Sequence, residues 1–327
     1  MKIFIYNERD FDEKQFFDRF AGEFGIEIGS TEMNPTPETA DLAAGADYIS
    51  IITTPVDEGL MKQFHDLGIR MICTRSIGID HIDAAAAKKY GIRISRSIYA
   101  PDCVADYTVM LMLMVNRKMK AILGRADIQD YTLKGIMGIN MKTQTVGVIG
   151  TGRIGTQVIE SLHGFGCRIL AYDLYQNEKA REMASYVPLA DLISQSDIIT
   201  LHMPLTDDNF HMIDENAIAQ MKDGVRIINT ARGGLIDSNA LIKGLESGKI
   251  GGVGLDCVEN EFNLYYYDLR SRPLDHEQLA ILRSFPNAVV SPHMAFYTDT
   301  TVHDQVYSSV YACVLDAAGR ENPYQAG

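Results

Sequence analysis

Residues 145–155 have the sequence TVGVIGTGRIG, in which a continuous apolar run leads directly into a glycine-rich turn. The run 145–149 is typical of a strand that is buried on both faces. The turn places Gly150, Gly152 and Gly155 in the pattern GxGxxG, and the residues after it have a helical pattern. Glycines at these positions allow a tight turn and the close approach of a pyrophosphate to the start of the helix. The stretch therefore predicts the strand–turn–helix unit of a Rossmann-type domain.

A carboxylate follows at the end of the next predicted strand, residues 167–172. Asp173 stands 18 residues after Gly155, where it can accept a hydrogen bond from an adenosine ribose 2′-hydroxyl and repel a 2′-phosphate. The turn and the carboxylate together favour NAD over NADP. The alternative is a tight glycine turn followed by an exposed aspartate without a ligand.

Short β-branched runs alternate with longer helical stretches along the whole chain, as in parallel sheets covered by helices. A length of 327 residues favours two domains in this α/β chain. Strands are predicted at 2–6, 48–52, 71–74 and 92–95 in the first unit, and at 145–149, 167–172, 197–201, 225–229, 252–255 and 288–290 in the second. Helices are predicted at 10–23, 104–120 and 298–318, and the last of these could pack back onto the first unit.

The helix 104–120 has apolar residues around most of its circumference. This predicts burial between domains or in a homodimer interface, because such a surface is too hydrophobic to be left in water. Met110, Met112 and Met114 are expected to fill the core.

The composition excludes several classes of partner. Forty-three acidic and thirty basic residues give a formal net charge of -13, which repels nucleic-acid phosphates and anionic lipid headgroups. No apolar run approaches the roughly 18 residues of a membrane span, and the N-terminus has no signal-peptide pattern. The five cysteines are scattered without a CxxC pair, so neither a disulfide framework nor a metal site is predicted. We expect a cytoplasmic protein with reduced thiols.

Polar residues follow three further predicted strands, at the edge where open α/β sheets bind ligands. These segments are His202-Met203-Pro204, Asn229-Thr230-Ala231-Arg232-Gly233-Gly234 and Ser291-Pro292-His293. The guanidinium of Arg232 is placed to bind a carboxylate or a carbonyl oxygen, the alternative being a surface salt bridge. His293 is either a proton donor in a cleft or a satisfied core histidine, and the spacing does not decide between them.

Three carboxylates, Asp256, Glu259 and Glu261, follow the predicted strand 252–255. One carboxylate next to His293 would hold the ring tautomer and raise the pKa of the imidazole. The spacing leaves open which of the three it is.

These motifs, in this order and over nearly the whole chain, resemble the D-2-hydroxyacid dehydrogenase family. Within the family the chain is most similar to the D-lactate dehydrogenases, including the type found in glycopeptide-resistance operons. This narrower resemblance rests on Thr74-Arg75-Ser76-Ile77-Gly78, Val104-Ala105-Asp106-Tyr107 and Ala295-Phe296-Tyr297-Thr298.

The resemblance implies a set of site residues. Arg232, Glu261 and His293 would be catalytic, Asp256 would lie near the nicotinamide amide, and the backbone N–H groups of Ile77 and Gly78 would bind the substrate carboxylate. The remaining implied cofactor contacts are Gly150, Gly152, Arg153, Ile154, Gly155, Asp173, Met203, Pro204, Asn209, Thr230 and Ala231. The implied substrate pocket contains Tyr99, Phe296 and Tyr297, with Ile51 and Ile52 as further apolar lining.

The resemblance also implies an architecture: a split flavodoxin-like substrate domain (1–100 and 299–327), an NAD-binding Rossmann domain (101–298), and an active site in the cleft between them. One departure is that Phe262 follows Glu261 where many relatives have proline, and the loop Tyr265-Tyr266-Tyr267 comes next. The D-lactate branch shares this feature.

The implied reaction is NADH-dependent reduction of a 2-keto acid, with pyruvate to D-lactate as the first choice and branched or aromatic 2-keto acids as the alternative. Arg232 would stabilise the growing oxyanion and His293 would supply the proton. Two other classes are weighed against this: an NAD-sensing corepressor on the same fold, and a formate or phosphoglycerate dehydrogenase. A homodimer formed through the NAD-binding domains is expected.

Overall fold

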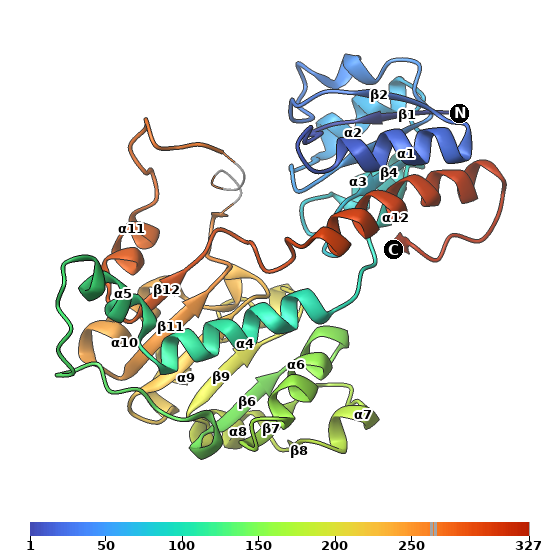
Figure 1. Cartoon of the computed structure of the whole chain (residues 1–327). Helices are drawn as coiled ribbons and strands as arrows, with labels where there is room; N and C mark the ends of the chain where they lie inside the picture. The colour runs from blue at the N-terminus through green and yellow to red at the C-terminus, as the bar shows by residue number, and fades with distance from the viewer. Residues whose placement is uncertain (262–263, 265–266, 327) are drawn as a thin grey trace. The chain divides into compact units, whose positions relative to one another are not determined.

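The computed structural model describes residues 1–261, 264 and 267–326 (Figure 1). Contacts within the chain divide it into two compact units. Unit 1 comprises Met1–Ala100 and Tyr297–Gly327, and unit 2 comprises Pro101–Phe296. The chain thus returns to unit 1 at Tyr297, two residues before position 299, where the sequence places the boundary.

Unit 1 is built on a six-stranded sheet with the order β13-β5-β4-β3-β1-β2. Its parallel strands are β1 (Lys2–Ile5), β2 (Glu27–Ser30), β3 (Tyr48–Ile51), β4 (Met71–Thr74) and β5 (Arg93–Arg96). The short strand β13 (Gln325–Ala326) pairs antiparallel with β5. The order of the five parallel strands, 2-1-3-4-5, is that of flavodoxin-like folds.

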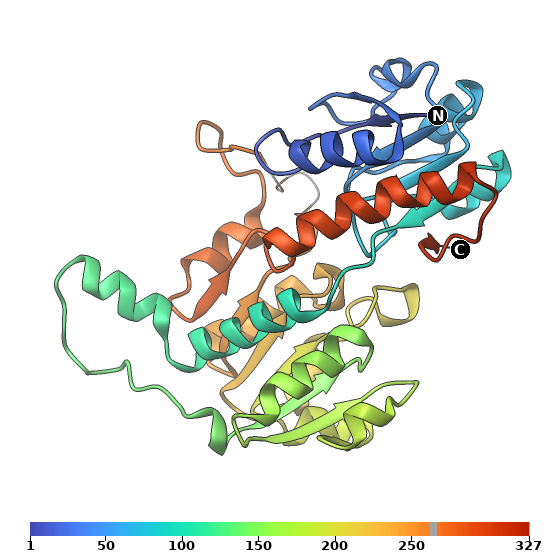
Figure 2. The same ribbon diagram turned by 45° about the vertical axis from the view of Figure 1, so that its right-hand side comes forward.

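Helices cover both faces of this sheet because successive side chains of each strand point to opposite faces. Ile3 and Ile5 pack with α1 (Lys14–Phe24) and α12 (Asp299–Ala317). Phe4 pairs instead with the core on the other face, which contains residues of α2 (Glu58–Asp66) and α3 (Ala84–Tyr90). Figure 2 shows α12, near the C-terminal red end of the colour scale, running beside the blue α1.

Unit 2 contains a seven-stranded parallel sheet with the order β12-β11-β10-β9-β6-β7-β8. The strands are β6 (Thr145–Ile149), β7 (Arg168–Tyr172), β8 (Ser185–Tyr186), β9 (Ile198–Leu201), β10 (Val225–Asn229), β11 (Ile250–Leu255) and β12 (Ala288–Val290). The chain winds outward from β6 to β8 and then crosses to β9 on the other side of β6. This reversal creates the switch point at which doubly wound sheets bind ligands, and the predicted α/β class is confirmed.

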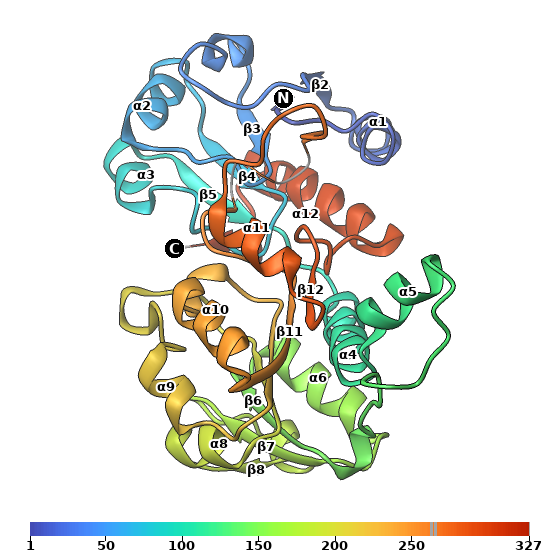
Figure 3. The same cartoon turned by 90° about the vertical axis from the view of Figure 1, so that its left-hand side faces the viewer.

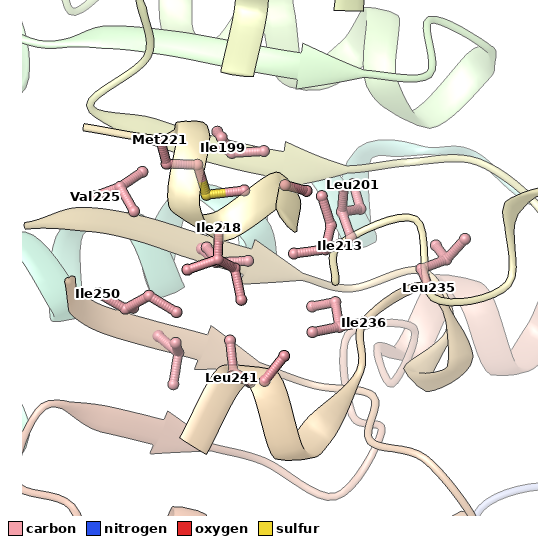
Figure 4. Close-up of a cluster of buried hydrophobic side chains, with 14 of the residues drawn as sticks. Ile199, Leu201, Ile213, Ile218, Met221, Val225, Leu235, Ile236, Leu241 and Ile250 are labelled. Atoms are coloured by element: carbon pink, nitrogen blue, oxygen red, sulfur yellow. The ribbon is translucent and has the colours of Figure 1, made fainter. Parts of the chain in front are cut away.

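The helices of unit 2 lie on both faces of the sheet. They are α4 (Asp102–Asn116), α5 (Met119–Asp127), α6 (Arg153–His163), α7 (Glu178–Arg181), α8 (Leu189–Gln195), α9 (Glu215–Gln220), α10 (Ser238–Ser247) and α11 (Glu277–Ser284). Figure 4 shows one of the two cores, in which Ile218 of α9 and Leu241 of α10 meet Ile250 of β11. The other core joins α4 and α6 to Val146 and Val148 of β6.

The predicted helix 104–120 is in fact two helices. Lys118 has a φ of 53°, in the left-handed region that a non-glycine residue rarely adopts, and it separates α4 from α5. Met112 is buried as predicted, but Met110 is 39% exposed and does not fill the core. In Figure 3, α5 and the loop after it project away from the sheet of unit 2. Among the described residues, no helix is both long and apolar enough to cross a membrane.

Candidate active site

The glycine turn after β6 is shaped by close backbone packing. Gly150 has a φ of +92°, and a Cβ there would lie 2.5 Å from the carbonyl oxygen of His202. A Cβ at Gly155 would lie 1.9 Å from the carbonyl oxygen of Gly150. Gly152, the N-cap of α6, has open space around its Cβ position. The turn therefore leaves room for a diphosphate to approach the start of α6, where backbone N–H groups and the helix dipole favour an anion.

Asp173, directly after β7, is tied to this turn. Its Oδ2 accepts hydrogen bonds from the backbone N–H of Thr151 at 2.5 Å and the hydroxyl of Thr151 at 3.2 Å, and its Oδ1 accepts one from Tyr175 N at 2.9 Å. An ionised carboxylate has about four acceptor sites, so capacity for a ribose hydroxyl remains. The geometry fits NAD, since the carboxylate is fixed beside the turn.

The other residues predicted to bind the cofactor lie near the same edge of the sheet. Arg153 and Ile154 begin α6, Met203 and Pro204 follow β9, and Thr230 and Ala231 follow β10. The hydroxyls of Thr230 and Thr108 of α4 are 2.8 Å apart. Asn209 caps its own loop, with Oδ1 accepting from Thr206 N and Nδ2 donating to Pro204 O, both at 2.8 Å.

His293 lies beside one of the three carboxylates that the sequence could not separate. Its Nδ1 is 3.2 Å from Oε1 of Glu261, and the second oxygen of Glu261 accepts a hydrogen bond from Val258 N at 2.8 Å. Glu259 points elsewhere, since it binds Nε2 of His211 at 2.6 Å and Ser238 N at 2.9 Å. Of these two glutamates, the structure therefore places Glu261 next to His293.

The histidine has an unusual backbone that is held by Asp256. His293 has a φ of 54°, in the left-handed region. Its N–H donates to the carbonyl of Asp256 at 2.9 Å, while the Asp256 carboxylate accepts from Met294 N and Ala295 N, both at 2.8 Å. The hydroxyl of Ser291 also donates to this carboxylate at 2.7 Å. The buried Asp256, implied by the resemblance to lie near the nicotinamide, thus braces the loop that carries His293.

Burial and charge act against each other on the imidazole. Burial lowers the pKa of His293, whereas the neighbouring Cys257 and Glu261 raise it, and the net pKa lies well above the ordinary value. Burial raises the pKa of the Cys257 thiol, so the thiol is protonated near neutral pH. Because a protonated thiol carries no charge, we attribute the raised pKa of His293 mainly to the Glu261 carboxylate, which is 94% buried and lies 3.2 Å from the ring nitrogen.

Arg232 follows β10 on a loop that packs against the loop after β11. A Cβ at Gly233 would lie 2.0 Å from the carbonyl carbon of Val258, so only glycine fits there. Asn229 Nδ2 donates to the carbonyl of Arg232, and Nη1 of Arg232 donates to the carbonyl of Ala231, both at 2.8 Å. Arg232 is close enough for its charge to lower the pKa of Glu261, although burial raises that pKa on balance. The structure thus brings Arg232, Glu261 and His293 together within unit 2.

The predicted substrate residues are divided between the two units. Ile77 and Gly78 follow β4, where the hydroxyl of Ser76 donates to the carbonyl of Gly78 at 2.7 Å. Tyr99 is buried and Tyr297 is 42% exposed in unit 1. The other lining residues of unit 1, Ile51 and Ile52, are buried, and Ile51 belongs to the core under α2 and α3.

The remaining predicted substrate residue, Phe296, belongs to unit 2, and its ring centre lies 6.4 Å from that of His293. Phe262, Tyr265 and Tyr266, which the sequence analysis singled out, lie outside the described residues, and Tyr267 is exposed.

Sequence reasoning missed two charged residues that contact Tyr297. The Tyr297 hydroxyl donates to Oδ2 of Asp12 at 2.7 Å, and the guanidinium of Arg9 lies 5.9 Å from the centre of the ring. These two residues could have been identified as site candidates from their position, because they come shortly after the first predicted strand, at the ligand-binding edge of a parallel sheet.

Comparisons with known proteins agree with these motifs. The model of the family D-isomer specific 2-hydroxyacid dehydrogenase, NAD binding domain, matches residues 109–295, within unit 2. An aromatic 2-oxoacid reductase of Clostridium sporogenes is 43% identical over 94% of this chain and 93% of its own length. A D-lactate dehydrogenase of Lactiplantibacillus plantarum is 36% identical over 95% of this chain and 94% of its own length. The solved structure of D-2-hydroxyisocaproate dehydrogenase has a TM-score of 0.87 and 37% identity, covering 100% of this chain and 99% of that one.

Proposed function

Because this chain belongs to the D-isomer specific 2-hydroxyacid dehydrogenase family, we propose that it reduces a 2-keto acid with NADH to the D-2-hydroxy acid, with pyruvate to D-lactate as the first reaction to test. The resemblance inferred from the sequence is confirmed, as is NAD as the cofactor. The observation that carries the proposal is the pair formed by the buried Glu261 and the partly buried His293 beside Arg232, on the same sheet edge as the glycine turn. An aromatic 2-keto acid is the second candidate, favoured by the 43% identity to the aromatic 2-oxoacid reductase.

The chain itself provides the acid and the cation for this reaction. The glycine turn and Asp173 would hold NADH, which would supply the hydride when bound. His293 donates a proton to the carbonyl oxygen of the substrate, and Arg232 stabilises the negative charge that develops there. Glu261 keeps the imidazole protonated until it is needed. The other residues implied as cofactor contacts are Arg153, Ile154, Met203, Pro204, Asn209, Thr230, Ala231 and Asp256.

We propose that unit 1 binds the substrate. The backbone N–H groups of Ile77 and Gly78 would bind the carboxylate, and Tyr99 and Tyr297 would contact the side chain of the substrate. Tyr297 supports this, since it is 42% exposed and part of its surface is accessible to a ligand. An apolar lining suits a methyl, branched or aromatic side chain better than a phosphate, which would require additional cations.

One set of steady-state measurements tests both substrate and coenzyme. We expect kcat/KM for pyruvate to be at least comparable to that for 2-ketoisocaproate and phenylpyruvate, and NADH to be preferred to NADPH because Asp173 repels a 2′-phosphate. A preference for phenylpyruvate of about tenfold, or 1.4 kcal/mol, would transfer the assignment to aromatic substrates. Equal kcat/KM for NADH and NADPH would refute the role of Asp173. If no 2-keto acid is reduced, the proposed function fails.

Replacing Glu261 by glutamine should shift the pH profile of reduction. Reduction needs the protonated imidazole, and the negative charge of Glu261 raises the pKa of His293. Removing that charge lowers this pKa, so the descending limb of kcat/KM against pH should move to lower pH. D-2-hydroxy acid oxidation, which needs neutral His293, should gain relative activity in mildly acidic buffer.

The matched control for this experiment is Glu259→Gln. Glu259 is only two residues away but binds His211 and Ser238 N instead of His293. Its profile should coincide with that of the unmodified protein. A shift in the Glu259 variant with none in the Glu261 variant would show that the wrong carboxylate has been assigned.

We also propose a cytoplasmic homodimer formed through unit 2. A hollow lined by Val109, Met110, Leu113, Met114 and Phe165, among others, lies on α4 and α6. The segment after α5 exposes four large apolar side chains, Ile128, Tyr131, Leu133 and Met137, each more than 70% accessible. A second copy of the chain would cover both apolar surfaces. The five free cysteines suit a reducing compartment.

Light scattering tests the proposed assembly directly. We expect a mass near twice 36.3 kDa at micromolar concentration. A mass near 36.3 kDa would contradict the dimer.

A further inference from the structure

A chain of charged residues in unit 1 joins Tyr297 to the loop that follows β4. Asp12 accepts the hydroxyl of Tyr297 at 2.7 Å and also binds Nε of Arg9 through both of its oxygens, at 2.9 and 3.0 Å. Arg9 also pairs with Glu13 at 3.1 Å, and Glu13 in turn binds Nε of Arg75 at 2.8 Å. We call these four residues, Arg9, Asp12, Glu13 and Arg75, the ion-pair network of unit 1.

The network is largely shielded from water. The side chains of Arg9 and Asp12 are 13% and 15% exposed, and those of Glu13 and Arg75 are fully buried. Arg75 also donates to Ser50 Oγ at 2.9 Å and to the carbonyls of Tyr6 and Asn7 at 3.0 Å, so its position is determined from several sides. Charged hydrogen bonds in such surroundings are stronger and more directional than surface ion pairs, which are mobile and worth little.

Both ends of the network reach residues of the proposed substrate site. Arg75 immediately precedes Ser76, Ile77 and Gly78, which form the proposed carboxylate-binding loop. At the other end, burial and the hydrogen bond to Asp12 raise the pKa of Tyr297, so its hydroxyl keeps the proton that it donates. The hydrogen bond to Asp12 thus restrains the hydroxyl end of the Tyr297 side chain, in addition to the restraint from its backbone.

We propose that Asp12 is a specificity-determining positioning residue: it fixes the Tyr297 ring as a rigid wall for the part of the substrate side chain farthest from the keto carbon. This inference rests on the proposed function, since it assumes that Tyr297 lines the pocket. A preformed wall avoids the entropic cost of ordering the Tyr297 ring when the substrate binds. A bulky substrate reaches the wall and benefits, whereas the methyl group of pyruvate does not.

The test compares two substrates across a double-mutant cycle of Asp12→Ala, Tyr297→Phe and the double variant. Tyr297→Phe removes only the hydroxyl, and Asp12→Ala removes its acceptor. For phenylpyruvate we expect KM to rise about two- to tenfold in each single variant with little change in kcat, and the double variant to be no worse than either. Where phenylpyruvate is a poor substrate, its Ki against pyruvate is measured instead. The KM for pyruvate should rise less than the KM for phenylpyruvate in the same variants, because a methyl group makes less contact with the Tyr297 ring.

Two further variants separate positioning from general damage. Asp12→Asn keeps an oxygen that can accept the Tyr297 hydroxyl, so it should recover part of the effect of Asp12→Ala on phenylpyruvate. Asp10→Asn changes an exposed carboxylate on the same loop and should leave both substrates unaffected. Thermal melting of each variant shows whether the fold is retained.

The outcomes distinguish this inference from the proposed function. Additive effects of the two single changes, or equal losses for pyruvate and phenylpyruvate, would overturn the role of Asp12 while leaving the dehydrogenase assignment intact. Absence of turnover with every 2-keto acid in the unmodified protein would overturn the proposed function, and the present inference with it.

Discussion

Replacing His293 by asparagine is expected to lower kcat/KM for 2-keto acid reduction by about 10²–10⁴-fold, the usual contribution of a positioned acid or base. The affinity for NADH should be unchanged, because the glycine turn and Asp173 do not depend on the imidazole. The loss should appear mainly in kcat, since the proton is transferred in the transition state. Steady-state kinetics together with NADH fluorescence titration measure the two quantities separately.

Asparagine is the replacement of choice because of the backbone. His293 has a φ of 54°, which asparagine tolerates better than most residues, whereas alanine would add strain of roughly 1 kcal/mol or more. His211→Asn is a close control: His211 also has a φ of 54° but binds Glu259. A large loss in the His211 variant with none in the His293 variant would remove His293 from the mechanism.

Replacing Arg232 by glutamine should cost about 10²–10³-fold in kcat/KM, comparable to the removal of an oxyanion-stabilising donor. The effect should be divided between kcat and the KM for the keto acid, because a guanidinium can bind both the developing oxyanion and the substrate carboxylate. Arg232→Lys should recover part of kcat, as it keeps the charge, but not the KM, as it loses the planar fork. The backbone of Arg232, with a φ of -144°, accepts either residue without strain.

Arg226, near the start of strand β10, which leads into the Arg232 loop, provides the control for this experiment. It binds the side chain of Gln144 at 3.2 Å, away from the carboxyl end of the strand where the site lies. Arg226→Gln should leave both kinetic constants near their original values. Comparable losses in the two variants would mean that the two arginines act through the stability of the fold and not through the reaction.

Strands with strong apolar character could be predicted almost to the residue. The run 145–149 coincides with β6, and 225–229 coincides with β10, because both are buried on both faces and bounded by polar residues. The edge strands β2, β8 and β13 were missed, since they are short or partly exposed and carry no apolar run. The break at Lys118 has no glycine or proline to signal it.

The residues of the candidate site could be predicted from the sequence, but not which of them contact one another. Strand ends placed Arg232 and His293 at one edge, yet two nearby glutamates looked equivalent. The side chains of Glu259 and Glu261 point in different directions because Asn260 between them has a φ of 54°, which turns the chain. The spacing of residues in the sequence does not reveal this backbone conformation. The contact of Asp12 with Tyr297 joins residues 285 positions apart, so it depends on the tertiary fold alone.

The return of the chain to unit 1 has a consequence for how the protein is made. Unit 2 is continuous in sequence and can fold as soon as it has left the ribosome, whereas unit 1 lacks α12 and β13 until residues 297–326 are synthesised. Until then the face of its sheet that carries Ile3, Ile5 and Met71 lacks a main covering helix. The first hundred residues are therefore exposed to aggregation during translation until they dock with α12, through contacts between residues far apart in the sequence.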